Sequence, residues 1–440
     1  MLAFTTGLAE RPMRFLYSAL LYALVPLLLL RMLLRSRRAP AYRRRLGERF
    51  GVYPAGHEAE TASTAPAIWV HAVSVGELQA SSVLVEALLL AYPQHRLVLT
   101  TTTPTGSARV RAVFQQRVSH VYLPWDLPGS VNRFLDRYRP SLALFIETEL
   151  WPNLLAACRR RGCVSVLASA RLSATSARRY RRVAPLTRRM LQSLDAIGCQ
   201  TRADAQRFVA LGAPADAVSV TGSLKYDAVL TEQECAAALS LARTLGLDGR
   251  LVWVAGSTHS GEEGMLLDAL SQLQAEYPAL LLVLAPRHPE RFDAVAQLCA
   301  SRGIALVRRS AAVAVNASDT VLLLDSIGEL PLVYGAATVA FVGGSLVAAG
   351  GHNPLEAVRW SVPVVSGPHT DNAVDIYRQL QQVGAARQVS NAEDMLRVID
   401  KLLAQPERSA GMGAAGEAVI AANAGACEAT LALVRGLLAG

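Results

Sequence analysis

The chain has 440 residues and a mass of 47.0 kDa, which is too long for one ordinary hydrophobic core and long enough for two domains. Hydrophobic residues make up 52% and charged residues 18%, a composition that excludes disordered and fibrous proteins. The net charge of +9 lies in residues 11–50, which hold ten arginines and one acidic residue, whereas the other 400 residues carry 34 basic and 34 acidic groups. This distribution argues against a nucleic-acid-binding protein.

The arginine-rich segment contains a long apolar run. Phe15–Leu30 is uncharged, and Met32–Leu34 extends the run past Arg31. A membrane-spanning helix needs about 20 apolar residues, so this run predicts a membrane anchor that either spans the bilayer or lies in one leaflet. A secretory signal peptide has a similar apolar run, but eight arginines within Arg31–Arg49 oppose translocation. We therefore expect the domains on the cytoplasmic side, with the arginines forming a basic collar on an anionic membrane surface. A buried helix followed by a solvated basic loop is the alternative.

The rest of the chain alternates short apolar runs with helical patterns, which predicts an α/β fold of parallel sheets covered on both faces. The alternation breaks around residues 231–250 and then restarts. We expect an anchor and collar over 1–53, a Rossmann-like domain over 54–235 that begins with a polar linker at 54–66, and a second Rossmann-like domain over 236–440 that faces the first across a cleft. The predicted strands are Ala67–Val73, Arg96–Thr101, Leu142–Ile146, Val164–Ser169, Val218–Gly222, Leu251–Gly256, Leu280–Ala285, Val321–Asp325, Ala337–Gly344 and Val362–Gly367.

Acidic and basic residues follow the first-half strands, and doubly wound sheets bind ligands at the carboxyl ends of their strands. Glu77 occupies a strand-to-helix turn, where it suits either a general base or a carboxylate that stabilises the helix dipole. Glu147 and Glu149 follow the strand Leu142–Ile146, and in an extended segment they share a face. Lys225 is one of two lysines in a chain with 42 arginines, which indicates either a selected ammonium group or an ordinary surface lysine.

The second half places its polar residues in the same way. Arg287 and His288 follow one strand, and the glycines at 350–351 precede a predicted helix that starts near Pro354. Free N–H groups at such a helix start can hold a phosphate, and Glu356 just inside the helix suits a ribose. These residues together predict a nucleotide site in this half.

Several motifs are absent. No GxGxxG follows the first strand and no GxxxxGK[ST] is present, which disfavours NAD and P-loop binding. No DxD motif or histidine cluster indicates a bound metal. The six cysteines are scattered without a CxxC pair, which is typical of a reducing compartment. We expect no metal and no cofactor.

Eight motifs, in order, resemble those of the Kdo transferase family, whose members attach 3-deoxy-D-manno-oct-2-ulosonic acid (Kdo) to lipid A precursors in Gram-negative bacteria. The resemblance extends from about residue 15 to beyond residue 420, and the N-terminal anchor is similar to the family's layout. The motifs are WVHAVSVGE (Trp69–Glu77), FIETELWPN (Phe145–Asn153), SARLS (Ser169–Ser173), GSLKYD (Gly222–Asp227), GSTHSGEE (Gly256–Glu263), APRHPERF (Ala285–Phe292), DSIGEL (Asp325–Leu330) and GGHNPLEA (Gly350–Ala357).

This resemblance implies a GT-B glycosyltransferase fold, with an acceptor-binding domain over 54–235 and a donor-binding domain over 236–440. It implies an inverting reaction that transfers Kdo from CMP-Kdo to a lipid A precursor (lipid IVA) and releases CMP without a metal. It places the protein on the cytoplasmic side of the inner membrane.

The same resemblance assigns roles to individual residues. Glu77 would be the catalytic base, while Glu147 and Lys225 would assist the transition state. The residues that would contact CMP are Pro286, Arg287, Ile327, Gly328, Glu329, Asn353, Pro354, Leu355 and Glu356.

Two other interpretations stay open on the residues alone. The first is another GT-B nucleotide-sugar enzyme, such as a UDP-sugar epimerase or a MurG-like transferase, although the anchor and the SVGE and ETELWPN motifs argue against an epimerase. The second is a membrane-bound binding module that has lost catalysis. Such a module would keep Arg287 and Glu356 but would not need Glu77.

Overall fold

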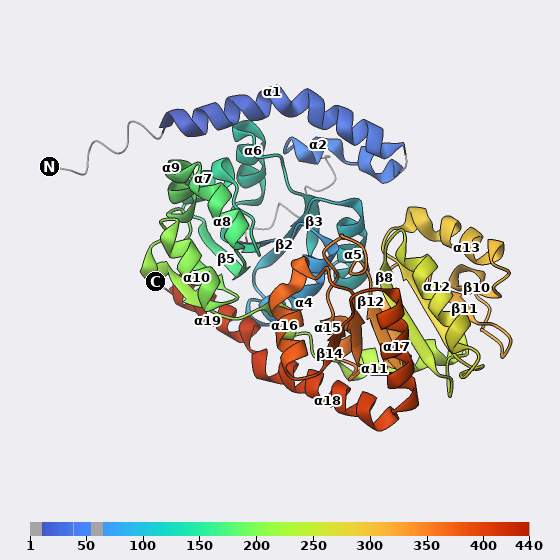
Figure 1. Ribbon diagram of the computed structural model, residues 1–440. Helices are drawn as coiled ribbons and strands as arrows, with labels where there is room; N and C mark the ends of the chain where they lie inside the picture. The colour runs from blue at the N-terminus through green and yellow to red at the C-terminus, as the bar shows by residue number, and fades with distance from the viewer. Residues whose placement is uncertain (1–10, 38, 54–64, 440) are drawn as a thin grey trace. The chain divides into compact units, whose positions relative to one another are not determined.

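A computed structural model describes residues 11–37, 39–53 and 65–439 of the chain (Figure 1). The predicted linker at 54–66 therefore lies outside the described residues except for its last two positions. The chain divides into two compact α/β units. Their extents are Met1–Asp227 with Asn423–Gly440 for unit 1, and Ala228–Ala422 for unit 2.

Unit 1 is built on a seven-stranded parallel sheet in the order β3-β2-β1-β4-β5-β6-β7. The chain winds outward from β1 in both directions, which is the doubly wound, Rossmann-like topology predicted from the alternating pattern. Its strands are β1 (Ala67–His71), β2 (Arg96–Thr101), β3 (Ser119–Tyr122), β4 (Pro140–Ile146), β5 (Val164–Ala170), β6 (Ala196–Cys199) and β7 (Val218–Val220).

Helices cover both faces of this sheet because successive strand residues point to opposite sides. Trp69 and Phe145 pack into the hydrophobic cluster on one face. Val70 and Leu144 pack into the cluster on the other face. The helices are α4 (Val75–Ala91), α5 (Pro104–Phe114), α6 (Pro128–Tyr138), α7 (Pro152–Arg160), α8 (Ala174–Arg181), α9 (Ala184–Leu191), α10 (Arg202–Ala210) and α19 (Ala426–Ala439), with a single 3-10 turn, η3 (Leu224–Tyr226), after β7.

The last helix, α19, belongs to unit 1 although it ends the chain. Its apolar residues join the cluster beneath α4, and the Asp227 carboxylate accepts a hydrogen bond from the Gly425 amide at 2.6 Å. The compact units therefore divide after Asp227, whereas the sequence prediction places one boundary at residue 235 and assigns the whole C-terminus to the second domain. A pattern read in chain order has no means of indicating that the final helix returns to the first unit.

Unit 2 repeats the doubly wound topology with a second parallel sheet of seven strands, in the order β10-β11-β9-β8-β12-β13-β14. The fold class predicted from the sequence is thus confirmed in both units. The strands are β8 (Val252–Thr258), β9 (Leu281–Pro286), β10 (Leu306–Arg308), β11 (Val321–Leu323), β12 (Val339–Val342), β13 (Val364–Ser366) and β14 (Ala386–Gln388). The main helices are α11 (Glu232–Leu245), α12 (Glu262–Leu273), α13 (Phe292–Ser301), α16 (Val374–Gln382), α17 (Ala392–Ala404) and α18 (Pro406–Asn423).

The N-terminal apolar run forms one helix, α1 (Arg11–Ser36), which packs against α7 and α9 of unit 1 (Figure 1). Near its start, the Ser18 hydroxyl lies within hydrogen-bond distance of the Asn153 side chain, at 3.0 Å from its nitrogen. At its end, Arg43 donates to the Ser36 hydroxyl at 2.6 Å. Most of its large apolar side chains are nevertheless exposed, including Phe15 at 76%. By length and composition Met13–Ser36 could cross a membrane, and so could Pro406–Leu438, which is more buried.

Two arginines of the predicted basic collar bind unit 1. Arg45 donates to the backbone oxygen of His120 at 2.8 Å, and the Arg49 guanidinium stacks over the Tyr122 ring at 4.1 Å. Between them, the buried Glu48 carboxylate accepts the Tyr122 amide at 2.8 Å. The collar is therefore divided, because its last arginines fasten the N-terminal segment to the sheet and are not available to face lipid.

Candidate active site

Glu77 lies at the start of α4, directly beyond the carboxyl end of β1. The Ser74 hydroxyl accepts the Glu77 amide at 3.2 Å and caps the helix, while the Glu77 carboxylate accepts the Val73 amide at 2.8 Å and the Ser74 hydroxyl at 3.1 Å. These reciprocal hydrogen bonds at the helix start hold the side chain in one position. The structure confirms that Glu77 lies in the first turn of the helix with its carboxylate at the strand end, and the role of general base stays a prediction.

Glu147 follows β4 in the left-handed region of the backbone, with φ of 63°. Its carboxylate lies 2.7 Å from the Nζ atom of Lys225, which η3 carries after β7. The positive φ turns the chain at this point, so the prediction that Glu147 and Glu149 share one face of an extended segment is wrong. A non-glycine residue in this region costs on the order of 1 kcal/mol, and such strain is concentrated at functional sites.

Glu149 is the third carboxylate at this strand end, and we call Glu77, Glu147 and Glu149 the strand-end cluster. Its carboxylate accepts the Trp151 indole N–H at 2.7 Å and lies 3.5 Å from the Nε2 atom of His71. His71 is fully buried at the end of β1, and its Nδ1 atom lies 2.8 Å from the Thr100 hydroxyl. His71 is therefore a packed core residue whose ring also faces the Glu149 carboxylate.

The surroundings of Glu77 favour its protonated form. Burial, together with the negative charges of Glu147 and Glu149, raises the pKa of Glu77 to about 7 against the opposing hydrogen bonds from Val73 and Ser74. A carboxyl group with a pKa near the working pH is suited to accept and release a proton. The edge of the unit 1 sheet therefore combines a tuned carboxylate with a compact ammonium group.

Unit 2 gathers its polar residues where the strand order reverses, around the carboxyl end of β8 and its neighbours β9 and β12. Glu262 organises the loops there, although the sequence analysis did not single it out. Its fully buried carboxylate accepts four backbone N–H groups at 2.7–2.9 Å, and such a carboxylate can fix two loops at once. The four donors are the amides of His259, Gly344, Ser345 and Leu346.

Three histidines lie close together in the loops that follow β8, β9 and β12. The Nε2 atoms of His259 and His352 lie 2.9 Å apart with the rings stacked, and His288 packs edge-on against His259. Burial, with the charge of Arg287, lowers the pKa of His352 to about 3, so this ring is neutral near pH 7. Arg287 itself is exposed and has no ion-pair partner among the described residues. The sequence offered a signal for His259, since it follows a strand within the GSTHSGEE motif.

The DSIGEL segment is anchored by two arginines. The carboxylate of Glu329 receives the Arg309 guanidinium at 2.9 Å, and Asp325 receives that of Arg308 at 2.7 Å. Burial opposes ionisation of Asp325, but its hydrogen bonds from Ser310 and Arg308 outweigh that effect and lower its pKa. Ile327 at the tip of the segment is 69% exposed. Because its two acidic side chains are held by the arginines, the segment exposes its backbone around Ile327. Gly328, with φ of 93°, completes the turn.

The glycine-rich segment before Asn353 leads into the predicted helix, which is very short. Helix α15 (Leu355–Val358) has a single turn, and its first amide, that of Leu355, already bonds to the Asn353 side chain at 3.2 Å. One turn has little macrodipole, so the expected phosphate site at a helix start loses most of its electrostatic support. Gly350 and Gly351 do adopt positive φ, as the close turn requires.

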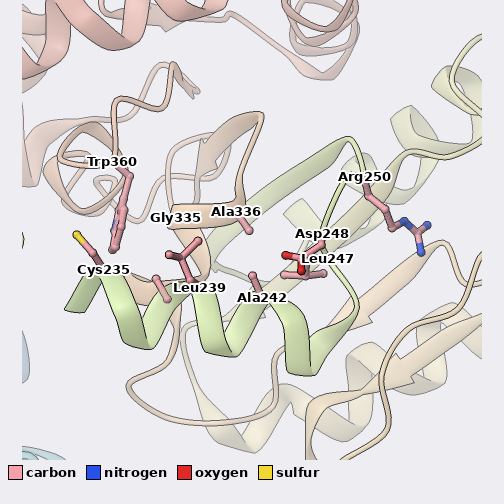
Figure 2. Close-up of a pocket in the computed structure, with 11 residues that line it drawn as sticks. Cys235, Leu239, Ala242, Leu247, Asp248, Arg250, Gly335, Ala336 and Trp360 are labelled. Carbon is pink, nitrogen blue, oxygen red and sulfur yellow. The ribbon is translucent and has the colours of Figure 1, made fainter. Parts of the chain in front are cut away.

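A separate groove of about 360 Å³ in unit 2 lies away from these residues (Figure 2). It is formed by α11, by the loop that precedes β8, and by the residues that precede β12, so it opens at the amino ends of the strands. Its wall includes Leu239 and Trp360. In the three described stretches of the chain, no group of three or more histidine, cysteine or acidic residues is arranged to hold a metal ion.

Two doubly wound parallel sheets define the GT-B class of glycosyltransferase fold, and solved structures agree. UDP-GlcNAc 2-epimerase from Neisseria meningitidis, bound to UDP-GlcNAc, matches with a TM-score of 0.56 at 15% identity, over 85% of this chain and all of that one. A family model described as 3-deoxy-D-manno-octulosonic-acid transferase (kdotransferase) matches residues 44–228.

Curated relatives match over nearly the whole length. The 3-deoxy-D-manno-octulosonic acid transferase of Haemophilus influenzae is 42% identical over 96% of this chain and 98% of its own. The protein of the same name from Bordetella pertussis is 41% identical over 95% of this chain and 98% of its own. The chain therefore belongs to the Kdo transferase family and is a glycosyltransferase.

Proposed function

We propose that this Kdo transferase takes Kdo from CMP-Kdo and attaches it to a hydroxyl group of a lipid A precursor, lipid IVA, at the cytoplasmic face of the inner membrane. The observation that carries this proposal is the arrangement at the edge of the unit 1 sheet. There a carboxylate with a pKa of about 7, Glu77, lies beside the Glu147–Lys225 pair. This set of groups suits the activation of a hydroxyl at neutral pH.

The reaction is an inverting displacement. A hydroxyl oxygen of the acceptor attacks C2 of Kdo, Glu77 accepts the hydroxyl proton, and the bond from C2 to the phosphate oxygen breaks so that its electron pair leaves with CMP. General base catalysis of this kind contributes about 10²- to 10⁴-fold. Glu147 holds Lys225 so that its ammonium group balances negative charge as the transition state forms.

The donor binds to unit 2 in this proposal. Arg287 is exposed and unpaired among the described residues, so its guanidinium is available for the CMP phosphate. The backbone turn at Ile327 and Gly328, fixed through Glu329, suits the cytidine. The remaining CMP contacts are Pro286, Asn353, Pro354, Leu355 and Glu356.

Arg287 supplies positive charge for the leaving phosphate in this proposal, so we expect transfer without a metal ion or cofactor. Undiminished turnover in excess EDTA supports this expectation, and a loss that Mg²⁺ restores would contradict it.

The membrane location rests on α1. The helix exposes apolar side chains along its length, its Ser18 bonds to Asn153 of α7, and the segment that follows it is fastened to the sheet by Arg45. We expect a helix held in this way to lie along the membrane surface, with its apolar side chains in a single leaflet. An amphiphilic acceptor would therefore reach the protein without leaving the bilayer.

The direct test is to incubate the purified protein with CMP-Kdo, generated in place, and a tetraacylated lipid A precursor, and to weigh the products. We expect products heavier by one or more Kdo residues, together with CMP. Thermal stabilisation by UDP but not by CMP would contradict the proposed donor and favour a UDP-sugar enzyme of the same fold.

A further inference from the structure

Unit 1 contains a second arginine-rich segment that is distinct from the N-terminal one. Residues 151–194 include ten arginines and no lysine, aspartate or glutamate. Acidic residues elsewhere in the chain offset this charge, which is why the net charge of the residues outside 11–50 is zero. The local density of positive charge nevertheless matches that of the N-terminal segment.

Six of these arginines lie on α8, on α9 and on the turn between them, and the side chains of five of the six are exposed. None of the five forms an ion pair with another described residue, in contrast to Arg161, which lies 2.8 Å from Asp136. Like charges crowded without acidic partners repel one another, so a surface of this kind indicates an anionic partner. We call it the α8–α9 arginine surface, and it consists of Arg178, Arg179, Arg181, Arg182 and Arg188.

This surface adjoins both α1 and the candidate active site. Tyr180, on α8 among the arginines, is near Glu149 of the strand-end cluster, and burial together with the Glu149 charge raises the pKa of Tyr180. Tyr180 is also close to Tyr17 of α1. Helices α7 and α9 both pack against α1, and Figure 1 shows them near its N-terminal half.

The turn between α8 and α9 is apolar and exposed. Val183 is 40% exposed, and Ala184 and Pro185 are exposed beside it. An apolar tip flanked by arginines is typical of elements that lie at a membrane interface, where the tip enters the acyl region and the guanidinium groups stay among the headgroups. On α1, Phe15 and Leu16 present the same kind of surface.

We propose that the α8–α9 arginine surface binds the anionic phospholipid headgroups of the membrane that receives α1. Charge complementarity favours this partner, as does the packing of α9 against α1, whose large apolar side chains are mostly exposed. The surface thereby forms a second membrane contact beside the strand-end cluster. It orients the carboxyl-end edge of the unit 1 sheet toward the bilayer. The inference rests on the proposed function only in assuming that α1 is membrane-bound.

The test uses the full chain and vesicles of defined composition. A variant with Arg178, Arg179, Arg181 and Arg182 all changed to Gln is compared with the wild type on phosphatidylcholine vesicles with and without phosphatidylglycerol. Each arginine near an anionic surface contributes about 1 kcal/mol, so we expect at least a tenfold weaker preference for anionic vesicles in the variant. Hydrogen exchange over residues 174–191 should slow on anionic vesicles in the wild type and not in the variant.

A matched control changes four exposed arginines of unit 2 to Gln and alters the net charge equally. The control should keep the wild-type preference for anionic vesicles, and its four positions are Arg243, Arg378, Arg397 and Arg408. Equal loss in the control and in the α8–α9 variant would overturn the proposal, since net charge alone would then explain binding. Protection of residues 174–191 by a phosphorylated acceptor lipid but not by phosphatidylglycerol would also overturn it, in favour of a substrate phosphate site. Transfer of Kdo in detergent micelles is measured in parallel, so failure of this inference is distinguishable from failure of the proposed reaction.

Discussion

The Nζ atom of Lys225 lies 2.7 Å from Oε1 of Glu147, which joins the turn after β7 to the strained residue at the end of β4. Both side chains are about four-fifths buried. The pairing neutralises one of two carboxylates near Glu77 and keeps the ammonium group at the sheet edge. It accounts for the presence of a lysine at this position in a chain that otherwise uses arginine, because the site accommodates a compact cation.

Replacing Lys225 with Met should reduce kcat about 10²-fold, the size of effect seen when one electrostatic stabiliser of a transition state is removed. Without Lys225, the negative charge of Glu147 would also raise the pKa of Glu77 further. The chain provides a matched control, since Lys401 on α17 is the only other lysine and is exposed. Lys401→Met should leave kcat unchanged, and equal losses in both variants would show that Lys225 has no special role.

The pH dependence of kcat/KM should follow Glu77. Because the ionised carboxylate is the base, activity should rise with pH through an inflection near pH 7, the value to which burial and the neighbouring carboxylates raise the pKa of Glu77. Glu149→Gln removes one of the negative charges, so the inflection should move to lower pH by roughly half a unit. Glu86→Gln, an exposed site on the same helix, is the control and should not move it. An unchanged inflection in Glu149→Gln would contradict the account.

The same carboxylate should limit stability at alkaline pH. A carboxyl group whose pKa is raised on folding stabilises the folded state while protonated, and that contribution is lost as pH rises from its unfolded value through about 7. Glu77→Gln cannot ionise, so its Tm should exceed that of the wild type at pH 8, and the difference should shrink at pH 5. Differential scanning calorimetry at the two pH values measures this. A variant less stable than the wild type at pH 8 would show that the capping hydrogen bonds outweigh the buried charge.

Glu262 should be the most sensitive buried carboxylate of unit 2. Glu262→Ala leaves four backbone N–H groups without their acceptor, which we expect to lower the free energy of opening of the β12 loop by about 4 kcal/mol. Native-state hydrogen exchange of the Gly344–Leu346 amides measures that free energy. The exposed Glu276 provides a control. Glu276→Ala should change the free energy of opening of the β12 loop by less than about 0.5 kcal/mol.

Strands inside clear apolar runs were predictable from the sequence, even where the strand itself is short. The run Arg96–Thr101 coincides with β2, and the three-residue strands β7, β11 and β13 were located within longer predicted runs. Strands β3, β6, β10 and β14 were missed because each has three or four residues and no longer apolar run marks it. A run of that length has no measurable periodicity, and its conformation is decided by pairing with strands that are distant in the chain.

The position of the candidate site residues at strand ends was predictable, since parallel strands bring their carboxyl ends to one edge. The local backbone conformation could not be predicted from the sequence. The positive φ of Glu147 separates it from Glu149, and the helix after Gly351 stops after one turn. Pairings between distant segments, such as Glu262 with the β12 loop or His259 with His352, depend on tertiary packing and leave no spacing signal.

The central claim is that Glu77 is the base in transfer from CMP-Kdo. Its most direct test is a single-turnover measurement of Kdo transfer by Glu77→Gln, with CMP affinity determined on the same preparation by calorimetry. The account predicts transfer slowed by about 10²- to 10⁴-fold with an unchanged Kd for CMP, because the base lies in unit 1 and the CMP contacts in unit 2. Transfer within roughly threefold of the wild-type rate, too small a loss for a general base, would contradict it.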